Sequence, residues 1–303
     1  MIDFIGDIHG HASTLKLLLK KLGYESKSGT YKHPERKILF IGDYIDRGPE
    51  IPETLHLVRN MVENGNAIAL MGNHEYNAIG FHTKDSNGGH LRKHDIKNII
   101  QHFDTIKQFQ NRQKEYDEFI DWFKTLPLFY ETEYFRAVHA CWDEKHINHL
   151  YDILPNQKIN DKQIADASCE SHHLFNIVEE TLKGKEMKMP VGLSFFDKDG
   201  TERTEIRTKW WENPETSTYK KMSVLPLDQL PDLPIDTSLL PYTNYYSENQ
   251  KPVFFGHYWL QGAPSLQKSN VCCLDYSVAK KGHLVAYRFD NEQILSNEKF
   301  VYV

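Results

Sequence analysis

Three short polar strings, each directly after a run of apolar residues, carry the side chains best suited to chemistry. They read GDIHG at residues 6–10, GDYIDRG at 42–48 and GNHE at 72–75, and two later histidines, His139 and His257, again follow apolar runs. Carboxylate, amide and imidazole groups are ligands for divalent metal ions, and a glycine turn after a strand lets the backbone come close to an ion or a phosphate. The strings therefore predict a metal centre that acts on phosphate groups.

A centre of two metal ions needs one ligand that touches both ions, and a carboxylate has the lone pairs to do so. We assign this bridge to Asp43. The other predicted ligands divide between the ions, with Asp7 and His9 on the first and with Asn73, His139 and His257 on the second. Mixed oxygen and nitrogen ligands suit manganese, and also iron or zinc, better than magnesium or calcium. A water shared by two such ions loses a proton near neutral pH and becomes the nucleophile.

Each string alone has an ordinary explanation, because a Gly-Asp pair or a lone histidine is more often a turn or a core residue than a metal ligand. Unrelated turns would not, however, place all of these ligand types after successive apolar runs. Asp46 and Arg47 could belong to the site, or they could instead form a surface ion pair that caps the next helix. Glu75 either supports the site from behind the ligands or only occupies the first turn of a helix.

In their order and their spacing of about thirty residues, the three strings resemble those of the phosphoprotein-phosphatase branch of the calcineurin-like metallophosphoesterases. The resemblance covers residues 1–142 well and 252–290 more loosely, and it implies the same division of metal ligands. It also implies that Arg47 holds the phosphate and that His74, oriented by Asp46, protonates the leaving group. A guanidinium fork matches two phosphoryl oxygens, and an imidazolium held by a carboxylate is a competent general acid.

The residues around the strings are closer to the bacterial members of this branch than to the eukaryotic protein phosphatases. Ala69, Leu70 and Met71 precede GNHE, at the place where the eukaryotic enzymes have Leu-Arg. Ala140 and Cys141 follow His139, at the place where the eukaryotic enzymes have Gly-Gly. The bacterial members include symmetrical diadenosine tetraphosphatases and small serine/threonine protein phosphatases. The resemblance therefore implies either of two substrate classes.

The expected function is hydrolysis of phosphomonoesters, on phosphorylated proteins or small molecules, by attack of a metal-bound hydroxide. The alternative is a symmetrical bis(5'-nucleosyl)-tetraphosphatase or a related nucleotide phosphohydrolase. A third possibility, an inactive scaffold of the same fold, is less consistent with the chain, because a pure binding module has no use for His74, Asp46 and Arg47.

Alternating strands and helices must position these side chains. Apolar runs predict strands at 1–5, 38–41, 67–71, 135–140, 253–255, 271–274 and 284–289. Apolar residues at helical spacing predict helices at 13–22 and 51–62, and two more within 95–124. The catalytic loops then gather at one edge of the sheets. We predict a four-layer α/β metallophosphoesterase sandwich of two mixed β-sheets flanked by helices.

We expect a single calcineurin-like metallophosphoesterase domain over residues 1–303, with a cap insertion at 144–251. This block lies between two predicted metal ligands, His139 and His257, so its ends are pinned beside the active site. It contains no internal repeat and no flexible linker, which favours a cap built into the domain over a separate one.

Arginine and tryptophan side chains stand close together within the cap. Arg203 and Arg207 are predicted to bind substrate, and Trp210 or Trp211 could stack a base beside them. The alternative is a buried aromatic cluster with the arginine stems packed over it.

The composition fits a cytoplasmic enzyme. The chain has 303 residues and a net charge of −6 without basic runs, which argues against a dedicated nucleic-acid or membrane-surface binder. No signal-peptide pattern precedes the first strand, and no apolar run reaches membrane-spanning length. The four cysteines show no Cys-X-X-Cys spacing, which suits a reducing compartment.

Overall fold

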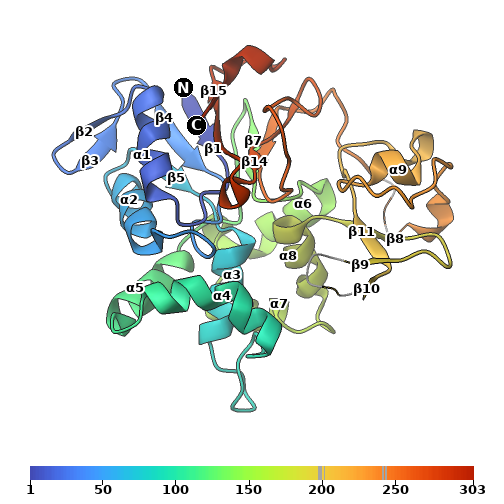
Figure 1. The fold of residues 1–303 in the computed structure, drawn as a ribbon, viewed down its shortest axis with the longest axis horizontal. Coiled ribbons are helices and arrows are strands. Elements are labelled where there is room, and N and C mark those ends of the chain that lie inside the picture. Colours follow the sequence, from blue (N-terminus) through green and yellow to red (C-terminus); the bar gives the residue numbers. More distant parts are fainter. Residues whose placement is uncertain (197–199, 201, 241, 243) are drawn as a thin grey trace.

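Two mixed β-sheets pack face to face at the centre of the molecule (Figure 1). The computed structural model describes residues 1–196, 200, 202–240, 242 and 244–303. The first sheet has the order β14 (Asp275–Tyr276), β15 (His283–Phe289), β1 (Ile2–Ile5), β4 (Lys37–Phe40) and β5 (Ala67–Ala69), and β16 (Phe300–Tyr302) also pairs with β15. The second sheet has the order β13 (Val271–Cys273), β12 (Val253–Phe255), β7 (Arg136–Val138) and β6 (Phe129–Glu131).

Aromatic side chains fill the space between the two sheets. Phe4 of β1 stacks on Phe254 of β12 with ring centres 3.7 Å apart, and Phe135 and Phe289 pack edge-on against both rings. Each fully buried phenylalanine contributes about 2–3 kcal/mol of hydrophobic stabilisation. This layer fixes the distance between the sheets, and therefore the distance between the loops at their edges.

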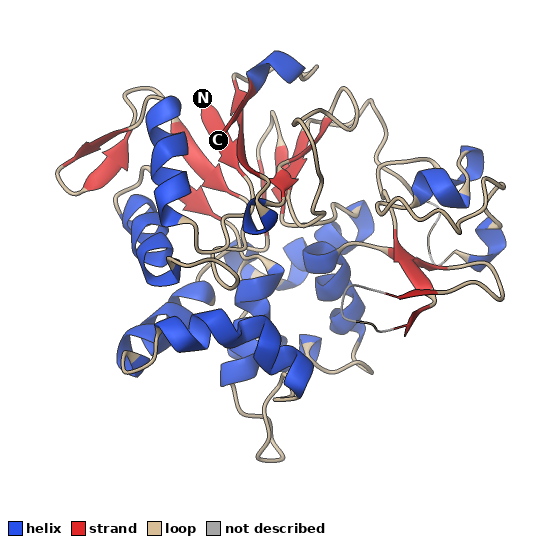
Figure 2. Ribbon diagram, in the orientation of Figure 1, coloured by secondary structure: helices blue, strands red, loops and turns tan. Residues whose placement is uncertain are grey.

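Helices cover the outer face of each sheet, which completes the predicted four layers (Figure 2). On the first sheet lie α1 (Ala12–Lys21) and α2 (Ile51–Glu63), and α1 buries Leu15, Leu18 and Leu19 at the spacing of one helical face. On the second sheet lie α6 (Glu144–Ile153) and α8 (His173–Lys183), whose Leu150 and Val178 join the same core. The predicted fold class is confirmed.

Three further helices lie on one side of the sheets (Figure 1). They are α3 (Asn73–His82), α4 (Ile96–Gln108) and α5 (Gln113–Phe123). The two helices predicted within 95–124 are confirmed by α4 and α5, whereas a helix at the position of α3 was considered only as one alternative for Glu75. A small hairpin, β2 (Glu25–Lys27) and β3 (Thr30–Lys32), projects beside α1. None of the helices in the described part of the chain has both the length and the apolar character that a membrane crossing requires.

The segment 144–251 has two parts. Its helices α6 and α8, joined through α7 (Asp161–Ala167), pack into the main core. The remainder forms a lobe at one side of the molecule, coloured yellow to orange in Figure 1. The lobe contains the strand pairs β8 (Glu186–Lys188) with β11 (Glu205–Arg207) and β9 (Phe195–Phe196) with β10 (Glu202–Arg203), followed by α9 (Tyr219–Met222). Met187, Ile206 and Met222 belong to a small hydrophobic core within this lobe.

Candidate metal centre

The five predicted strand ends converge at one edge of the two sheets. Asp7, Asp43 and Asn73 follow β1, β4 and β5, which run parallel in the first sheet. His139 and His257 follow β7 and β12, which run parallel in the second. Because the carboxyl ends of parallel strands meet at the same edge, the sheet topology itself brings these side chains together.

Asp43 lies at the centre of the cluster. Its Oδ2 is 3.7 Å from Nε2 of His9 and 3.9 Å from Nε2 of His74, whereas its Oδ1 is 3.4 Å from Nε2 of His139. Two groups of buried side chains have ligand atoms within 4.8 Å of one another, namely His9, Asp43 and His74, and Asp43, His139 and His257. Asp43 is common to both groups, which is the position that a bridging ligand requires.

Asn73 completes the second group. Its Oδ1 lies 3.0 Å from Nε2 of His139 and 2.7 Å from Nδ1 of His257. The other nitrogen of His139, Nδ1, donates to the carbonyl oxygen of Ile41 at 3.0 Å, which fixes the ring with its Nε2 toward the cluster. The three predicted ligands of the second ion therefore face one another.

The first group is less complete. Nδ1 of His9 donates to the carbonyl oxygen of Ile45 at 2.9 Å, and Nε2 of His9 accepts a hydrogen bond from Nη1 of Arg47 at 2.7 Å. Asp7 belongs to neither of the two groups, and its Oδ2 accepts the backbone N–H of His257 at 3.1 Å. Asp7 is nevertheless fully enclosed at the same edge of the sheet.

The electrostatics of the cluster fit divalent cations. Burial, together with the carboxylates of Asp275 and Asp43, raises the pKa of Asp7 well above its ordinary value. Burial also lowers the pKa of His9 and His257, which favours the neutral imidazole that binds metals. Several carboxylates buried together are costly unless cations compensate them. Nε2 of His257 is buried and has no hydrogen-bond partner among the residues that the structure describes.

The backbone is strained at the same positions. His9, Asp43, Asp46, Arg47 and His257 have φ angles of 44°, 55°, 65°, 69° and 73°, in the left-handed region that side chains other than glycine rarely adopt. Each such residue costs about 1–3 kcal/mol unless its surroundings hold it in place, and such strain concentrates at functional sites.

Two glycines of the motifs leave room for the carboxylates. A Cβ atom on Gly72 would lie 2.2 Å from Oδ1 of Asp43, and one on Gly256 would lie 2.0 Å from Oδ1 of Asp7. The sequence predicted that the backbone at the glycine turns comes close to an ion or a phosphate. In the structure, the backbone at Gly72 and Gly256 comes close to the carboxylates of Asp43 and Asp7.

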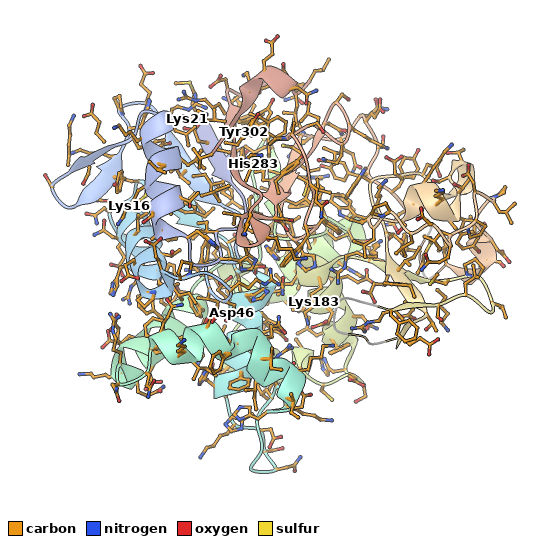
Figure 3. The ribbon with its side chains drawn as sticks, in the orientation of Figure 1. Lys16, Lys21, Asp46, Lys183, His283 and Tyr302 are labelled. Carbon is orange, nitrogen blue, oxygen red and sulfur yellow. The ribbon has the colours of Figure 1, made fainter. Side chains whose placement is uncertain are left out.

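His74 and Asp46 form a buried pair. Nδ1 of His74 donates to Oδ2 of Asp46 at 2.5 Å, and Oδ1 of Asp46 accepts hydrogen bonds from His102 at 2.8 Å and from Thr105 at 2.5 Å. Burial alone would raise the pKa of Asp46, but His102 and His74 lower it below its ordinary value. The alternative of a surface ion pair between Asp46 and Arg47 is therefore wrong. Asp46 lies beside α4 (Figure 3), which supplies His102 and Thr105, two residues that the sequence analysis missed.

Glu75 joins two of the motif loops. Its carboxylate accepts the backbone N–H groups of Asp43 at 2.9 Å, of Tyr44 at 2.8 Å and of Gly72 at 3.0 Å. Although Glu75 also lies in the first turn of α3, these bonds favour the supporting role over a merely helical one.

Arg47 is held by an indole ring that the sequence analysis also missed. The guanidinium carbon of Arg47 lies 3.8 Å from the ring centre of Trp259, and Nζ of Lys280 lies 4.0 Å from the same ring. Both cations are within cation–π distance of the indole. The backbone N–H of Trp259 donates to Oδ2 of Asp275 at 2.7 Å, which fixes the loop that carries the indole.

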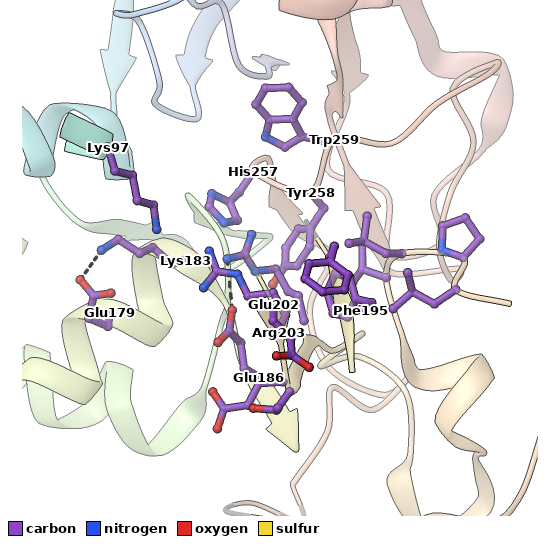
Figure 4. A pocket seen from close by; sticks show the side chains of 18 of the residues that line it. Lys97, Glu179, Lys183, Glu186, Phe195, Glu202, Arg203, His257, Tyr258 and Trp259 are labelled. Atoms are coloured by element: carbon purple, nitrogen blue, oxygen red, sulfur yellow. Dashed lines mark hydrogen bonds and ion pairs between the residues drawn. The ribbon is translucent and has the colours of Figure 1, made fainter. Parts of the chain in front are cut away.

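A cleft of about 910 Å³ opens beside the cluster, and His257, Arg47 and Trp259 line its inner end. Lys97 from α4 and Phe195 from the side lobe line it from other directions (Figure 4). The basic side chains of its lining are Arg47, Lys97, Lys183, Arg203, Arg207 and Lys280. Glutamates lie among them, and Glu186 contacts Arg207 at 3.4 Å. Arg203 and Arg207 therefore lie where substrate contacts were predicted, and their role stays a prediction.

Comparison with known proteins identifies the family. The sequence model described as calcineurin-like phosphoesterase matches residues 1–257. The chain belongs to this family.

Two of the relatives that the chain resembles are named bis(5'-nucleosyl)-tetraphosphatases, one asymmetrical and one symmetrical. The chain is 35% identical over 130 residues to PrpE of Oceanobacillus iheyensis, named as an asymmetrical bis(5'-nucleosyl)-tetraphosphatase. This match covers 42% of the chain and 50% of that protein, so it spans half of the relative's length. The chain is also 26% identical over 313 residues to a protein of Marinomonas sp. named as a symmetrical bis(5'-nucleosyl)-tetraphosphatase. This match covers 96% of the chain and 94% of the relative. A protein serine/threonine phosphatase from Saccharomyces cerevisiae shares the fold, with a TM-score of 0.51 at 13% identity over 100% of this chain and 78% of that one.

The predicted stacking of a base is wrong for Trp210 and Trp211. Both rings are buried against Phe255, and Nε1 of Trp210 donates to the carbonyl oxygen of Ala140 at 3.0 Å. The alternative of a buried aromatic cluster is correct for these two residues. Trp259 is an indole that does line the cleft.

Removing this indole is expected to loosen Arg47. We expect Trp259→Ala to lower kcat/KM of the phosphoesterase about 5- to 30-fold, mainly through a higher KM, because a cation–π contact contributes about 1–2 kcal/mol. Trp259→Phe, which keeps an aromatic face, should recover most of the loss. Steady-state kinetics with metal content measured in parallel tests this positioning role. Equal losses in both variants, or lost metal, would contradict it.

Proposed function

We propose that the chain hydrolyses phosphomonoesters at a centre of two divalent ions, most simply manganese. The ions would be held by Asp43 between them, and by Asp7, His9, Asn73, His139 and His257. When bound, they supply an activated water as nucleophile and neutralise charge on the phosphoryl group. The observation that carries this proposal is that Asp43 belongs to both groups of converging ligand atoms, beside a cleft lined by Arg47.

The side chains around the ions have separate tasks in this proposal. Arg47 binds two phosphoryl oxygens with its guanidinium fork, which the contact with Trp259 orients. His74 gives a proton to the leaving oxygen from Nε2, because its Nδ1 is engaged by Asp46. Asp46 itself accepts bonds from α4, so the imidazole is held in one orientation.

Arg47→Ala tests the phosphate-binding role. We expect kcat/KM to fall about 100-fold while both metal sites fill normally, because the guanidinium binds phosphoryl oxygens rather than ions. Kinetics and elemental analysis on the same samples provide the measurement. Arg59→Ala, which breaks a surface pair with Glu63, is the matched control and should leave the rate unchanged. Loss of metal in Arg47→Ala would speak for a structural role instead.

A second candidate substrate is a dinucleoside tetraphosphate. The cleft is larger than one phosphomonoester needs, and its basic residues continue beyond Arg47 to Arg203 and Arg207. A polyphosphate chain would engage several of these cations at once. In this proposal the segment 144–251 acts as a cap whose side lobe supplies the second wall of the cleft. The relative that spans almost the whole chain is named a symmetrical bis(5'-nucleosyl)-tetraphosphatase, which supports this candidate.

One experiment separates the two candidates. The manganese-loaded protein is assayed in parallel on phosphopeptides, diadenosine tetraphosphate, mononucleotides and a phosphodiester. Fast release of phosphate from monoesters supports the first candidate. Preference for diadenosine tetraphosphate, with two ADP as products and a selective loss in Arg203→Ala and Arg207→Ala, supports the second. No turnover of any of these substrates by protein with two bound ions would overturn the proposed function.

A further inference from the structure

Helix α4 exposes its apolar face. The five large apolar side chains of this face are Ile96 (77% exposed), Ile99 (40%), Ile100 (69%), Phe103 (53%) and Ile106 (38%). We call this set the α4 face. Five exposed apolar side chains on one helix form a contiguous patch, and such a patch on a globular protein marks a contact with another molecule. In Figure 1, α4 lies in the lower part of the molecule, away from the chain termini at the top.

The polar side of the same helix explains this orientation. His102 and Thr105 point inward and bind Asp46. Gln108 donates to the carbonyl oxygen of Gly48 and accepts the backbone N–H of Ile51, both at 2.8 Å. Turning the apolar side inward would break these bonds to the catalytic loop. The helix therefore uses its polar side within the molecule, and its apolar side must find cover elsewhere.

A groove continues the α4 face toward α5. It has a volume of about 540 Å³. Its apolar lining comes from Phe103 and Ile106 of α4 and from Phe109 and Tyr116, and its polar rim from His82, Lys107, Gln110, Asn111 and Gln113. Such a hollow beside a ridge of isoleucines can receive a large apolar side chain from a facing surface. The surface thus has both projecting and receiving parts.

We propose that the α4 face is the interface of a symmetric dimer, in which α4 packs antiparallel against α4 of a second copy. Ile96, Ile99, Phe103 and Ile106 follow the a and d positions of a heptad, which form a straight apolar seam that fits another helix. A twofold axis pairs the same patch on both copies, so the projecting side chains of each copy meet the groove of the other.

The exposed area fits one half of such an interface. At about 150–200 Å² for a large side chain, the exposed fractions of the α4 face amount to roughly 500 Å² of apolar surface. A stable interface buries about 800 Å² on each partner, and somewhat more than half of it is apolar. The α4 face therefore provides the apolar share that one subunit of a dimer contributes.

The charges at the ends of α4 favour the antiparallel direction. Asp95 caps the N-terminus of the helix, and Lys107 lies in its last turn. An antiparallel pair brings the acidic N-terminal end of α4 in one copy beside the basic C-terminal end of α4 in the partner subunit. The two helix dipoles are then also oppositely directed. A parallel pair would instead place like charges together.

Sedimentation velocity over a range of protein concentrations tests the proposal. The full chain is expected to sediment as a dimer, and Ile100→Glu is expected to sediment as a monomer at the same concentrations. Ile294→Glu is the matched control, because Ile294 is 76% exposed but lies in the loop after β15, and it should remain dimeric. Circular dichroism and thermal melting show whether each variant is folded.

A disulfide experiment tests the geometry without a disruptive charge. Ile100 flanks the seam near its middle, where the twofold axis brings the two copies of the residue together, so Ile100→Cys should form a disulfide-linked dimer under mild oxidation. Cys169 is an exposed free cysteine, so the experiment uses a Cys169→Ser background. Ile294→Cys in the same background should stay monomeric on a non-reducing gel. A wild-type chain that stays monomeric at every concentration overturns the proposal. Binding of the α4 face of such a monomer to lipid vesicles would assign the face to a membrane surface instead.

Discussion

Asp43→Asn is expected to abolish hydrolysis, with a fall in rate of at least about 10⁴-fold, and to leave at most one metal ion bound. The reason lies in the position of Asp43 between the two groups of ligand atoms. An amide has one acceptor oxygen and no charge, so it cannot compensate two dications at once. Asparagine keeps the shape of the side chain, and it still offers an oxygen to the backbone N–H of His74, which Oδ1 of Asp43 accepts at 3.0 Å.

Metal content and folding distinguish this effect from simple unfolding. Elemental analysis after dialysis should give two ions for the wild-type chain and fewer for Asp43→Asn, whose melting curve without metal should stay cooperative. Asp121→Asn changes an exposed carboxylate on α5 and is the control for the substitution itself. Two bound ions and a near-normal rate in Asp43→Asn would remove Asp43 from the bridging position.

The strands β6, β14 and β16 were missed, whereas the other seven strands of the two sheets could be predicted, because apolar runs and sharp turns are local features. Helix α3 could not, although it begins inside the GNHE string. Its residues from Asn73 to Phe81 are all buried, so the segment lacks the alternation of apolar and polar faces that marks a helix at the surface. Helix α4 shows the opposite case, because its amphipathic pattern predicted the helix correctly but not which side faces solvent.

The missed residues of the site share a physical reason. His102 lies 56 residues after Asp46 in the chain, and only the packing of α4 against the motif loop brings them together. Trp259 was overlooked in favour of Trp210 and Trp211, which stand beside arginines in sequence but are buried in the core. Its position two residues after the predicted ligand His257 was the available signal. A contact between segments far apart in the chain, such as that of His102 with Asp46, cannot be predicted from local patterns in a single sequence.

The second large effect depends on the leaving group. His74→Ala is expected to lower the rate about 1,000-fold on alkyl phosphates and only a few-fold on nitrophenyl phosphate. A serine alkoxide is a poor leaving group that needs a proton as it departs, whereas nitrophenolate departs readily without one. Rates across phosphate esters of graded leaving-group acidity provide the measurement, with metal content checked in each sample.

Asp46→Asn should show the same dependence on the leaving group in weaker form, because Asp46 acts through the imidazole that it holds. The double variant should be no slower than His74→Ala alone, since both residues serve one proton transfer. Thr105 and His102 hold the other oxygen of Asp46, so the amide of Asp46→Asn keeps a place in the network and the fold should survive. Equal losses on every substrate, or additive losses in the double variant, would mean that His74 maintains metal binding or the fold and does not transfer a proton.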